Sequence, residues 1–200
     1  MKIVIIYGTS TDVGKTFLTV KYISRLKSRG KKVFAIKPVL SGYTDDGTSD
    51  SALISKALGL SESEVCKYQF KAPVSPNIAA KFENIELNFA SVVNFCKLAI
   101  EKYKSLNYDY FIIETAGGAY SPIASDGLCI DLSFAIPKSK SVLITSNYLG
   151  CISNTISAVK CFNFDVILFN NKGANTNQDY CNMITNTIKQ HTARRIHCTD

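Results

Sequence analysis

The sequence predicts an α/β fold of three layers, in which a mostly parallel sheet lies between two layers of helices. Short apolar runs alternate with longer segments of helical periodicity along the 200 residues. Strands that alternate with helices in this way pair in parallel through right-handed crossovers. A chain of this length buries most of its apolar surface in one core, so we expect residues 1–200 to form a single domain.

Five short runs of β-branched and aromatic residues are typical of strands that are buried on both faces. We predict strands at residues 3–7, 33–36, 110–113, 142–145 and 166–169. Other segments carry apolar residues at helical spacing. We predict helices at residues 15–28, 49–58, 87–104, 128–136, 152–162 and 179–190. Residues 37–47 are predicted to form a polar loop after the second strand.

Composition places the chain among ordinary globular proteins, with 46% hydrophobic and 20% charged residues. The seven cysteines are scattered without any C-x-x-C pair, which argues against a zinc site and against a disulfide framework. The apolar run at residues 1–8 is too short for a signal sequence or a membrane span. We therefore expect a cytoplasmic protein with no membrane partner.

The net charge of +7 raises the question of nucleic-acid binding. Residues 25–32 form the densest basic cluster, at the end of the first predicted helix. Cations at that position complement the helix dipole and are solvated. No aromatic residues alternate with them, as a surface for single strands requires. We interpret the cluster as a solvated helix end and expect no nucleic-acid partner.

Residues 8–16 read G-T-S-T-D-V-G-K-T directly after the first predicted strand. A loop G-x-x-x-x-G-K-[ST] at such a strand–helix junction binds phosphate groups with its backbone N–H groups. Here five residues rather than four separate Gly8 from Gly14. We expect Lys15 to reach the terminal phosphates and Thr16 to place its hydroxyl on Mg²⁺. The alternative is a glycine turn that only connects strand and helix.

The second predicted strand is followed by K-P-V-L-S-G at residues 37–42. Lys37 occupies the carboxyl end of the strand, and Pro38 fixes the backbone directly after it. Ligand sites in open α/β sheets gather beyond the carboxyl ends of the strands. This position favours a functional Lys37 over the alternative, a solvated surface lysine.

Two carboxylates complete a candidate magnesium site. Glu114 directly follows the third predicted strand and precedes T-A-G-G, where small residues let the backbone approach a ligand. Asp50 opens a helix, and by itself it is better read as an ordinary first-turn carboxylate. Together with Thr16, both carboxylates make a suitable shell for Mg²⁺. If they only hold the metal, replacing either by its amide should leave thermal stability nearly unchanged.

Six segments occur in the order found in dethiobiotin synthetases. They are G-T-S-T-D-V-G-K-T, K-P-V-L-S-G, S-D-S-A-L, A-P-V-S-P-N-I-A-A, E-T-A-G-G and L-G-C-I-S-N. The chain resembles that family over residues 1–171, and the longer loop G-x₅-G-K-T is the family's own form. The resemblance implies a homodimeric enzyme of biotin biosynthesis with a P-loop fold. It implies that 7,8-diaminopelargonate, CO₂ and ATP react to dethiobiotin, ADP and phosphate with Mg²⁺ bound.

The resemblance also implies roles for individual residues. Catalysis is assigned to Lys37, Lys15 and Thr11. Nucleotide contacts are implied for Asp12, Val13, Gly14, Lys15, Thr16, Phe17, Glu114, Thr115, Ala116, Gly117 and Asn170. Substrate contacts are implied for Thr11, Ser41, Gly150, Cys151 and Ile152, of which the last three come from the partner subunit. The chain departs from the family pattern at Asp12, Thr115 and Ser153, where glutamate, glycine and asparagine are usual.

The alternative function is a nucleotide-dependent switch, a partitioning-type ATPase of the same fold. Such proteins carry a lysine at the start of the loop, where this chain has Gly8, Thr9 and Ser10. Lys37 and Ser41 would have no function in a switch. A ligase of the amidotransferring type would need a glutaminase domain for which 200 residues leave no room.

The part of the sequence that should hold the nucleotide base differs from the family. There an asparagine–aspartate pair contacts the adenine edge, whereas here Asn170 and Asn171 are followed by Lys172. Beyond Gln190 the sequence is polar and without proline, so we predict a frayed end rather than a strand. We therefore expect weak selection of the base, with GTP or CTP accepted almost as well as ATP.

Overall fold

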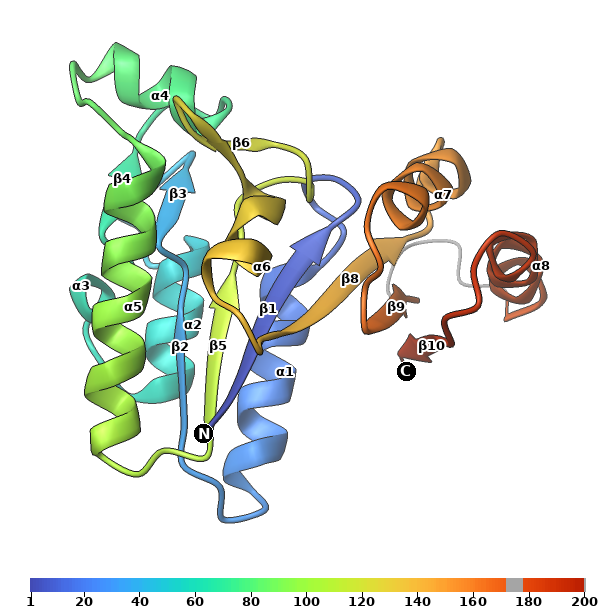
Figure 1. Cartoon of the computed structure of the whole chain (residues 1–200), viewed down its shortest axis with the longest axis horizontal. Coiled ribbons are helices and arrows are strands. Elements are labelled where there is room, and N and C mark those ends of the chain that lie inside the picture. Colours follow the sequence, from blue (N-terminus) through green and yellow to red (C-terminus); the bar gives the residue numbers. More distant parts are fainter. Residues whose placement is uncertain (172–177, 200) are drawn as a thin grey trace.

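The computed structural model describes residues 1–171 and 178–199 and has one large central sheet (Figure 1). Its six strands run parallel in the order β10-β9-β8-β1-β5-β2. Their bounds are Lys2–Gly8 (β1), Val33–Ile36 (β2), Tyr110–Glu114 (β5), Lys140–Ser146 (β8), Val166–Asn170 (β9) and Ile196–Thr199 (β10). The predicted α/β fold with a mostly parallel sheet is confirmed.

Helices cover both faces of the sheet because its strands are apolar on both sides. Helices α1 (Lys15–Lys27) and α2 (Asp50–Leu58) lie on one face, and α5 (Phe89–Ser105) and α6 (Leu132–Ala135) on the other (Figure 1). Along β1, Val4 and Ile6 pack with α1, whereas Ile5 and Tyr7 belong to the core on the α5 side. This alternation makes the three layers.

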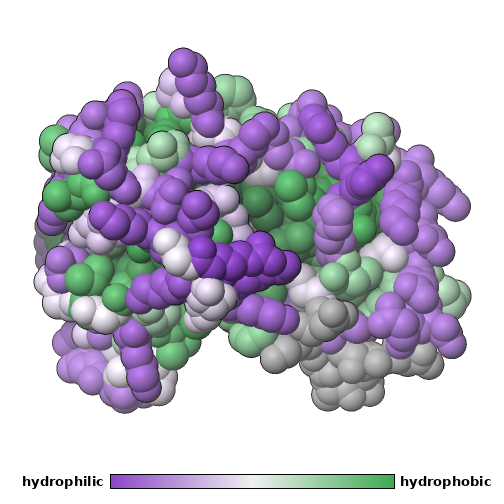
Figure 2. All heavy atoms as spheres, turned by 90° about the horizontal axis from the view of Figure 1, so that it is seen from below, coloured by the Kyte–Doolittle hydropathy of each residue, from purple (hydrophilic) through white to green (hydrophobic). Residues whose placement is uncertain are grey.

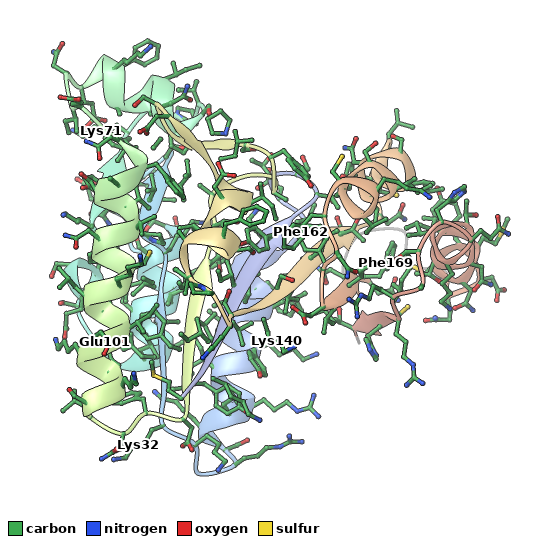
Figure 3. All side chains as sticks on the ribbon, in the orientation of Figure 1. Lys32, Lys71, Glu101, Lys140, Phe162 and Phe169 are labelled. Atoms are coloured by element: carbon green, nitrogen blue, oxygen red, sulfur yellow. The ribbon has the colours of Figure 1, made fainter. Side chains whose placement is uncertain are left out.

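The remaining long helices pack beside the other half of the sheet. These are α7 (Cys151–Cys161) and α8 (Gln178–Lys189). Phe169 of β9 is fully buried in an apolar group with Cys181 and Ile184 of α8 (Figure 3). Phe162, at the end of α7, packs edge-to-face against the ring of Phe134 on α6, with the ring centroids 5.9 Å apart.

The five predicted strands and five of the predicted helices are confirmed within two residues at each end. The predicted helix at residues 128–136 is wrong in part, because a 3₁₀ turn, Cys129–Asp131, precedes the short α6. The sequence did not reveal α3 (Glu62–Val65), α4 (Pro76–Phe82), β6 (Pro122–Ala124) or β7 (Gly127–Leu128). Elements of two to seven residues are too short to show a hydrophobic period.

The predicted polar loop at residues 37–47 is also wrong in part. Residues Val39–Ser41 form strand β3, which pairs in parallel with β4 (Tyr68–Phe70) in a small second sheet. Val39 and Leu40 are buried there. This pairing fixes the segment that follows Lys37, so the wall of the site is more rigid than a loop would be.

The predicted frayed end is wrong at its last residues. Strand β10 adds to the edge of the central sheet and pairs in parallel with β9. Only Ile196 of its four residues is buried, while His197 and Cys198 are exposed. An edge strand is covered on few sides, so its sequence needs little apolar character.

The parallel arrangement brings the carboxyl ends of β1, β2, β5 and β8 to one edge of the sheet, the upper edge in Figure 1. The phosphate-binding loop follows β1, Lys37 follows β2, and Glu114 ends β5. The candidate site therefore has to be sought at this edge.

Among the described residues, no helix is both long and apolar enough to cross a membrane.

The basic residues 25–32 lie at the opposite end of the molecule, on the face seen in Figure 2, which is covered mainly by hydrophilic side chains. The ammonium group of Lys27 donates to the carbonyl oxygens of Ala57 and Leu58, at 2.8 and 3.1 Å, at the end of α2. Lys31 forms an ion pair with Asp109 at 3.7 Å. These contacts are those of a solvated helix end.

Candidate active site

The loop between β1 and α1 requires glycine at position 14. Gly14 has a φ of 88°, in the left-handed region that favours glycine. A Cβ atom there would lie 2.1 Å from Nδ2 of Asn170. That amide group instead donates to the carbonyl oxygen of Val13 at 3.0 Å. The end of β9 is thereby attached to the loop.

Lys15 begins α1 and lies folded within the loop. Its ammonium group donates to the carbonyl oxygen of Ser10 at 3.0 Å. Burial and the charge of Lys37 lower the pKa of Lys15 to about 8. Phosphate oxygens would supply the negative charge that this lysine needs, which is the function that the loop motif predicts.

Glu114 accepts hydrogen bonds from three side chains at the centre of the site. Its Oε1 accepts from the hydroxyl of Thr16 at 2.6 Å and from the ammonium of Lys37 at 2.9 Å. Its Oε2 accepts from the hydroxyl of Thr19 at 2.6 Å. The side chain of Glu114 is fully buried. A buried carboxylate is stable only with such partners, so Glu114 holds α1 and the end of β2 together.

Lys37 joins this carboxylate to a second one. It forms an ion pair and a hydrogen bond with Asp50 at the start of α2, besides those with Glu114. Burial disfavours its charge, but the two carboxylates outweigh burial and raise the pKa of Lys37. The same ammonium group, with the hydroxyl of Thr16, lowers the pKa of Asp50 against the effect of burial. Lys37 is therefore a fixed cation beside the loop.

A cavity of about 660 Å³ opens above this charged group. Of the residues predicted to bind ligands, it is lined by Thr11, Asp12, Ser41, Asp50 and Gly117. Gly117 has a φ of 64°, and a Cβ atom there would lie 2.9 Å from Oγ of Ser121. Lys15, Thr16, Lys37 and Glu114 are buried and do not line the cavity themselves. Lys37 is connected to the cavity through its ion pair with Asp50. The structure thus brings Asp50, which was predicted to bind the metal, together with Thr11 and Ser41, two of the predicted substrate residues.

Other predicted residues lie elsewhere. Thr115 is buried, and its hydroxyl donates to the carbonyl oxygen of Ile6 on β1 at 3.0 Å. Ala116 is buried and accepts from the thiol of Cys129 at 3.0 Å. The side chain of Val13 is in the core beneath α1, while Phe17 is 38% exposed on α1. None of these four side chains lines the cavity.

The predicted substrate residues Gly150, Cys151 and Ile152 lie at the start of α7. Gly150 caps this helix with a φ of 94°. The three residues do not line the 660 Å³ cavity of the same chain. Leu149, directly before them, is completely exposed. Within one chain, these three residues therefore lie apart from the predicted substrate residues Thr11 and Ser41.

The sequence missed part of the cavity wall. One side of it is formed at the start of α4 by Pro73, Val74, Ser75 and Pro76. The segment A-P-V-S-P-N-I-A-A, one of the six that carry the family resemblance, includes these residues, but the resemblance implied no function for them. Thr19 was also missed, although it follows Thr16 by three residues on α1 and so lies on the same face of the helix.

The predicted magnesium ligands fit a divalent cation in charge and in atom type. The ammonium group of Lys37 already lies between the carboxylates of Asp50 and Glu114. The hydroxyl of Thr16 donates to the carboxylate of Glu114. Asp50 is 38% exposed and lines the cavity, whereas Glu114 is buried behind it. Among the described residues, no three His, Cys, Asp or Glu side chains are placed to hold a metal ion. Nucleotide phosphates would supply the other ligands, as is usual for Mg²⁺.

The parallel sheet, with a glycine-rich loop between its central strand and the following helix, defines a P-loop nucleotide-binding protein. The fold is similar to the hydrogenase maturation factor HypB from Archaeoglobus fulgidus, with a TM-score of 0.54 and 15% identity over 100% of this chain and 81% of that one. It is also similar to the MinC:MinD cell division protein complex from Aquifex aeolicus, with a TM-score of 0.52 and 14% identity over 98% and 79%. At these identities the similarity shows the fold alone and does not favour the switch.

Sequence comparison identifies the family within this class. A family model described as an AAA domain matches residues 2–193. The ATP-dependent dethiobiotin synthetase BioD of Caulobacter vibrioides is 32% identical over 80% of this chain and 73% of that protein. The same enzyme of Methanococcus vannielii is 37% identical over 78% and 70%. The chain belongs to the dethiobiotin synthetase family, whose members are ATP-dependent ligases.

We expect Gly14→Ala to impair folding and ATP binding more than Gly30→Ala does. Both glycines have left-handed backbone, at φ 88° and 68°, so both substitutions carry the same strain of roughly 1 kcal/mol. Only at Gly14 would the new Cβ meet another group, whereas Gly30 has open space around it. Urea unfolding and ATP titration of both variants measure the difference. Equal effects would contradict the contact between Asn170 and the loop.

We expect Glu114→Gln to lower the free energy of unfolding by about 3–5 kcal/mol, because it leaves the buried charge of Lys37 with one carboxylate fewer. Asp50→Asn should cost less, since that side chain is 38% exposed. The sequence alone predicts that neither substitution affects stability. Because Glu114 is fully buried, the structure predicts a loss of stability for Glu114→Gln. Urea unfolding of both variants is the measurement. A Glu114→Gln variant as stable as the wild type would show that Lys37 does not depend on this carboxylate.

Proposed function

We propose that this chain makes dethiobiotin from 7,8-diaminopelargonate, CO₂ and ATP as a single domain that spans residues 1–200. The observation that carries the proposal is Lys37, a fixed ammonium group between Asp50 and Glu114 beside the phosphate-binding loop. A nucleotide switch has no use for a second buried cation at this position. An anionic substrate that receives a phosphoryl group does require one.

In the proposed reaction, one amine of the substrate and CO₂ first form a carbamate. A carbamate oxygen then attacks the γ-phosphate of ATP, which gives a mixed anhydride and ADP. The second amine attacks the carbonyl carbon of the anhydride, closes the ureido ring and expels phosphate. Each step after the first concentrates negative charge, so placement and neutralisation of charge matter more than covalent help from the protein.

The residues of the cavity suit these steps. Lys15 and Lys37 would neutralise the phosphate and the carbamate. Thr11 and Ser41, which line the cavity, would hydrogen-bond the amine or the carbamate and orient it. The apolar side chains of Leu40, Val74 and neighbouring prolines would contact the alkyl chain of the substrate. Asp50, which lines the cavity, would be the carboxylate that Mg²⁺ reaches first, with Thr16 and Glu114 behind it. The ion would supply further positive charge at the phosphates.

We propose further that the enzyme acts as a homodimer. The start of α7, with Gly150, Cys151 and Ile152, would offer backbone N–H groups to the substrate carboxylate of the neighbouring subunit. The exposed Leu149 and Gly150, directly before Cys151, support this arrangement. All seven cysteines are free thiols, which supports a reducing compartment such as the cytoplasm.

The test is whether ATP turnover depends on 7,8-diaminopelargonate and bicarbonate, and whether Lys37→Ala abolishes it. We expect dethiobiotin formation by the wild type and a loss of about 10²–10³ in kcat for the variant, as for other preorganised charges. Because Lys37 is buried, the thermal unfolding of the variant has to be measured as well. Substrate-independent hydrolysis by the wild type would refute the function, and full turnover by folded Lys37→Ala would refute the role of Lys37.

We propose that the enzyme selects its nucleotide base weakly. Asn170, which should contact the base, already donates to the loop carbonyl of Val13, and its Oδ1 lies 3.5 Å from the hydroxyl of Thr199. The acid of the family's asparagine–aspartate pair is missing here, because Asn171 and Lys172 follow Asn170. Lys172 lies outside the described residues. Loss of about two hydrogen bonds, at roughly 0.5–1.5 kcal/mol each, reduces discrimination by about one to two powers of ten.

We therefore expect similar kcat/KM values for ATP, GTP and CTP, because Gly14, Lys15 and Thr16 contact only phosphate. Steady-state kinetics with the three nucleotides at saturating Mg²⁺ is the measurement. A preference for ATP of about a hundredfold or more would contradict the proposal. It would mean that β10 or its neighbours contribute base contacts that replace the missing pair.

A further inference from the structure

A chain of hydroxyl groups connects the phosphate-binding loop with the start of α7. Thr9 is the first residue of the loop after β1, and Tyr148 lies in the turn between β8 and α7. The hydroxyl of Tyr148 donates to Oγ1 of Thr9 at 2.9 Å. The Thr9 hydroxyl donates to Oγ1 of Thr145, on β8, at 3.1 Å. Oγ1 of Thr155, on α7, lies 2.9 Å from Oγ1 of Thr145.

Both ends of the chain return to α7. The side-chain amide of Asn154 donates to the hydroxyl of Tyr148 at 3.1 Å. Oγ1 of Thr155 lies 2.6 Å from the carbonyl oxygen of Cys151. The backbone N–H of Cys151 in turn donates to the carbonyl oxygen of Tyr148 at 3.0 Å. The first turn of α7 is thus held from both sides.

The protons of the chain can be arranged in one direction. The carbonyl oxygen of Cys151 only accepts, so Thr155 uses its single proton there and Thr145 donates to Thr155. The order is then Asn154, Tyr148, Thr9, Thr145, Thr155 and the Cys151 carbonyl, with every hydroxyl both donating and accepting. A network in which each member is satisfied is rigid, and the loss of one member leaves its neighbours unpaired.

Position and burial distinguish this chain from incidental surface bonds. Thr145 and Thr155 are completely buried between β8 and α7. Thr9 and Asn154 line a second cavity of about 430 Å³, together with Ser121, which also lines the 660 Å³ cavity. The backbone N–H of Thr9 is fixed by the carbonyl oxygen of Ile144 at 2.9 Å. A shift of the loop at Thr9 would therefore be transmitted to the start of α7.

We propose that Thr9 and Tyr148 are positioning residues for the reaction, because they fix the start of α7 relative to the phosphate-binding loop. This inference rests on the proposed function, which assigns the substrate carboxylate to Gly150, Cys151 and Ile152. In the proposed homodimer the chain links the loop of one subunit to the substrate contact that it provides for its neighbour. The hydroxyls of both residues are used within the chain, in bonds to each other, to Thr145 and to Asn154. We therefore expect the effect to fall on the diamine and not on ATP.

The test compares KM values of the diamine and of ATP in variants of the purified full chain. Tyr148→Phe and Thr9→Val each remove one hydroxyl, and Thr9→Ser retains it. Tyr120→Phe is a matched control, because Tyr120 lines the second cavity but is not part of the chain of hydroxyls. We expect Tyr148→Phe and Thr9→Val to raise the diamine KM about five- to tenfold, the effect of one buried hydrogen bond, with the ATP KM changed less than twofold.

Thr9→Ser and Tyr120→Phe should behave like the wild type. The double variant Tyr148→Phe, Thr9→Val should raise the diamine KM no more than either single variant, because the two substitutions break the same chain of hydroxyls. The inference is overturned by an unchanged diamine KM in Tyr148→Phe, by multiplied effects in the double variant, or by an equal rise in the ATP KM. Should Thr9→Val fail to fold in thermal unfolding, Tyr148→Phe decides alone. A wild type that forms no dethiobiotin would overturn the proposed function and this inference together.

Discussion

The arrangement of the site depends on one buried ion pair, between Lys37 and Glu114. Three elements meet there: Lys37 directly follows β2, Glu114 ends β5, and α1 supplies the two threonines that donate to the same carboxylate. Neither charge would be stable in the core without the other. The pair therefore fixes the distance between the phosphate-binding loop and the carboxyl end of β2. Asp50 then brings the start of α2 to the same ammonium group.

This arrangement connects stability with chemistry. A cation that is fixed by two carboxylates cannot move away when a phosphoryl group approaches, so no reorganisation is needed during the reaction. Glu114 is fully buried and Asp50 is partly exposed at the cavity, so the two carboxylates are unequal. Asp50 is the one that a metal ion or a ligand can reach from the cavity. Glu114 acts mainly by keeping Lys37 and Thr16 in place.

The phosphate-binding loop is fixed at both ends by side chains of distant strands. Asn170 at the end of β9 holds the carbonyl oxygen of Val13, and Thr145 on β8 accepts from Thr9. Both strands lie on the same side of β1 in the sheet. The half of the sheet that carries α7 and α8 thus supports the loop, while the other half provides Lys37 and Glu114. The nucleotide and the substrate would meet where these two halves join.

The sequence by itself determined the fold class, the strand–helix order and the candidate residues at the strand ends. Hydrophobic period and loop motifs are local properties, so the G-x₅-G-K-T loop, Lys37 and Glu114 could be placed before any contact was known. Only the tertiary structure decided which of these residues meet. It showed that Thr115 bonds to β1 instead of lining the cavity, and that polar residues at 196–199 add an edge strand. It also revealed the hydroxyl chain from Thr9 to α7, in which Thr9 is more than one hundred residues away in sequence from Thr145 and Tyr148. Side-chain hydrogen bonds between distant segments leave no periodic signal, because each depends on the packing of the whole sheet.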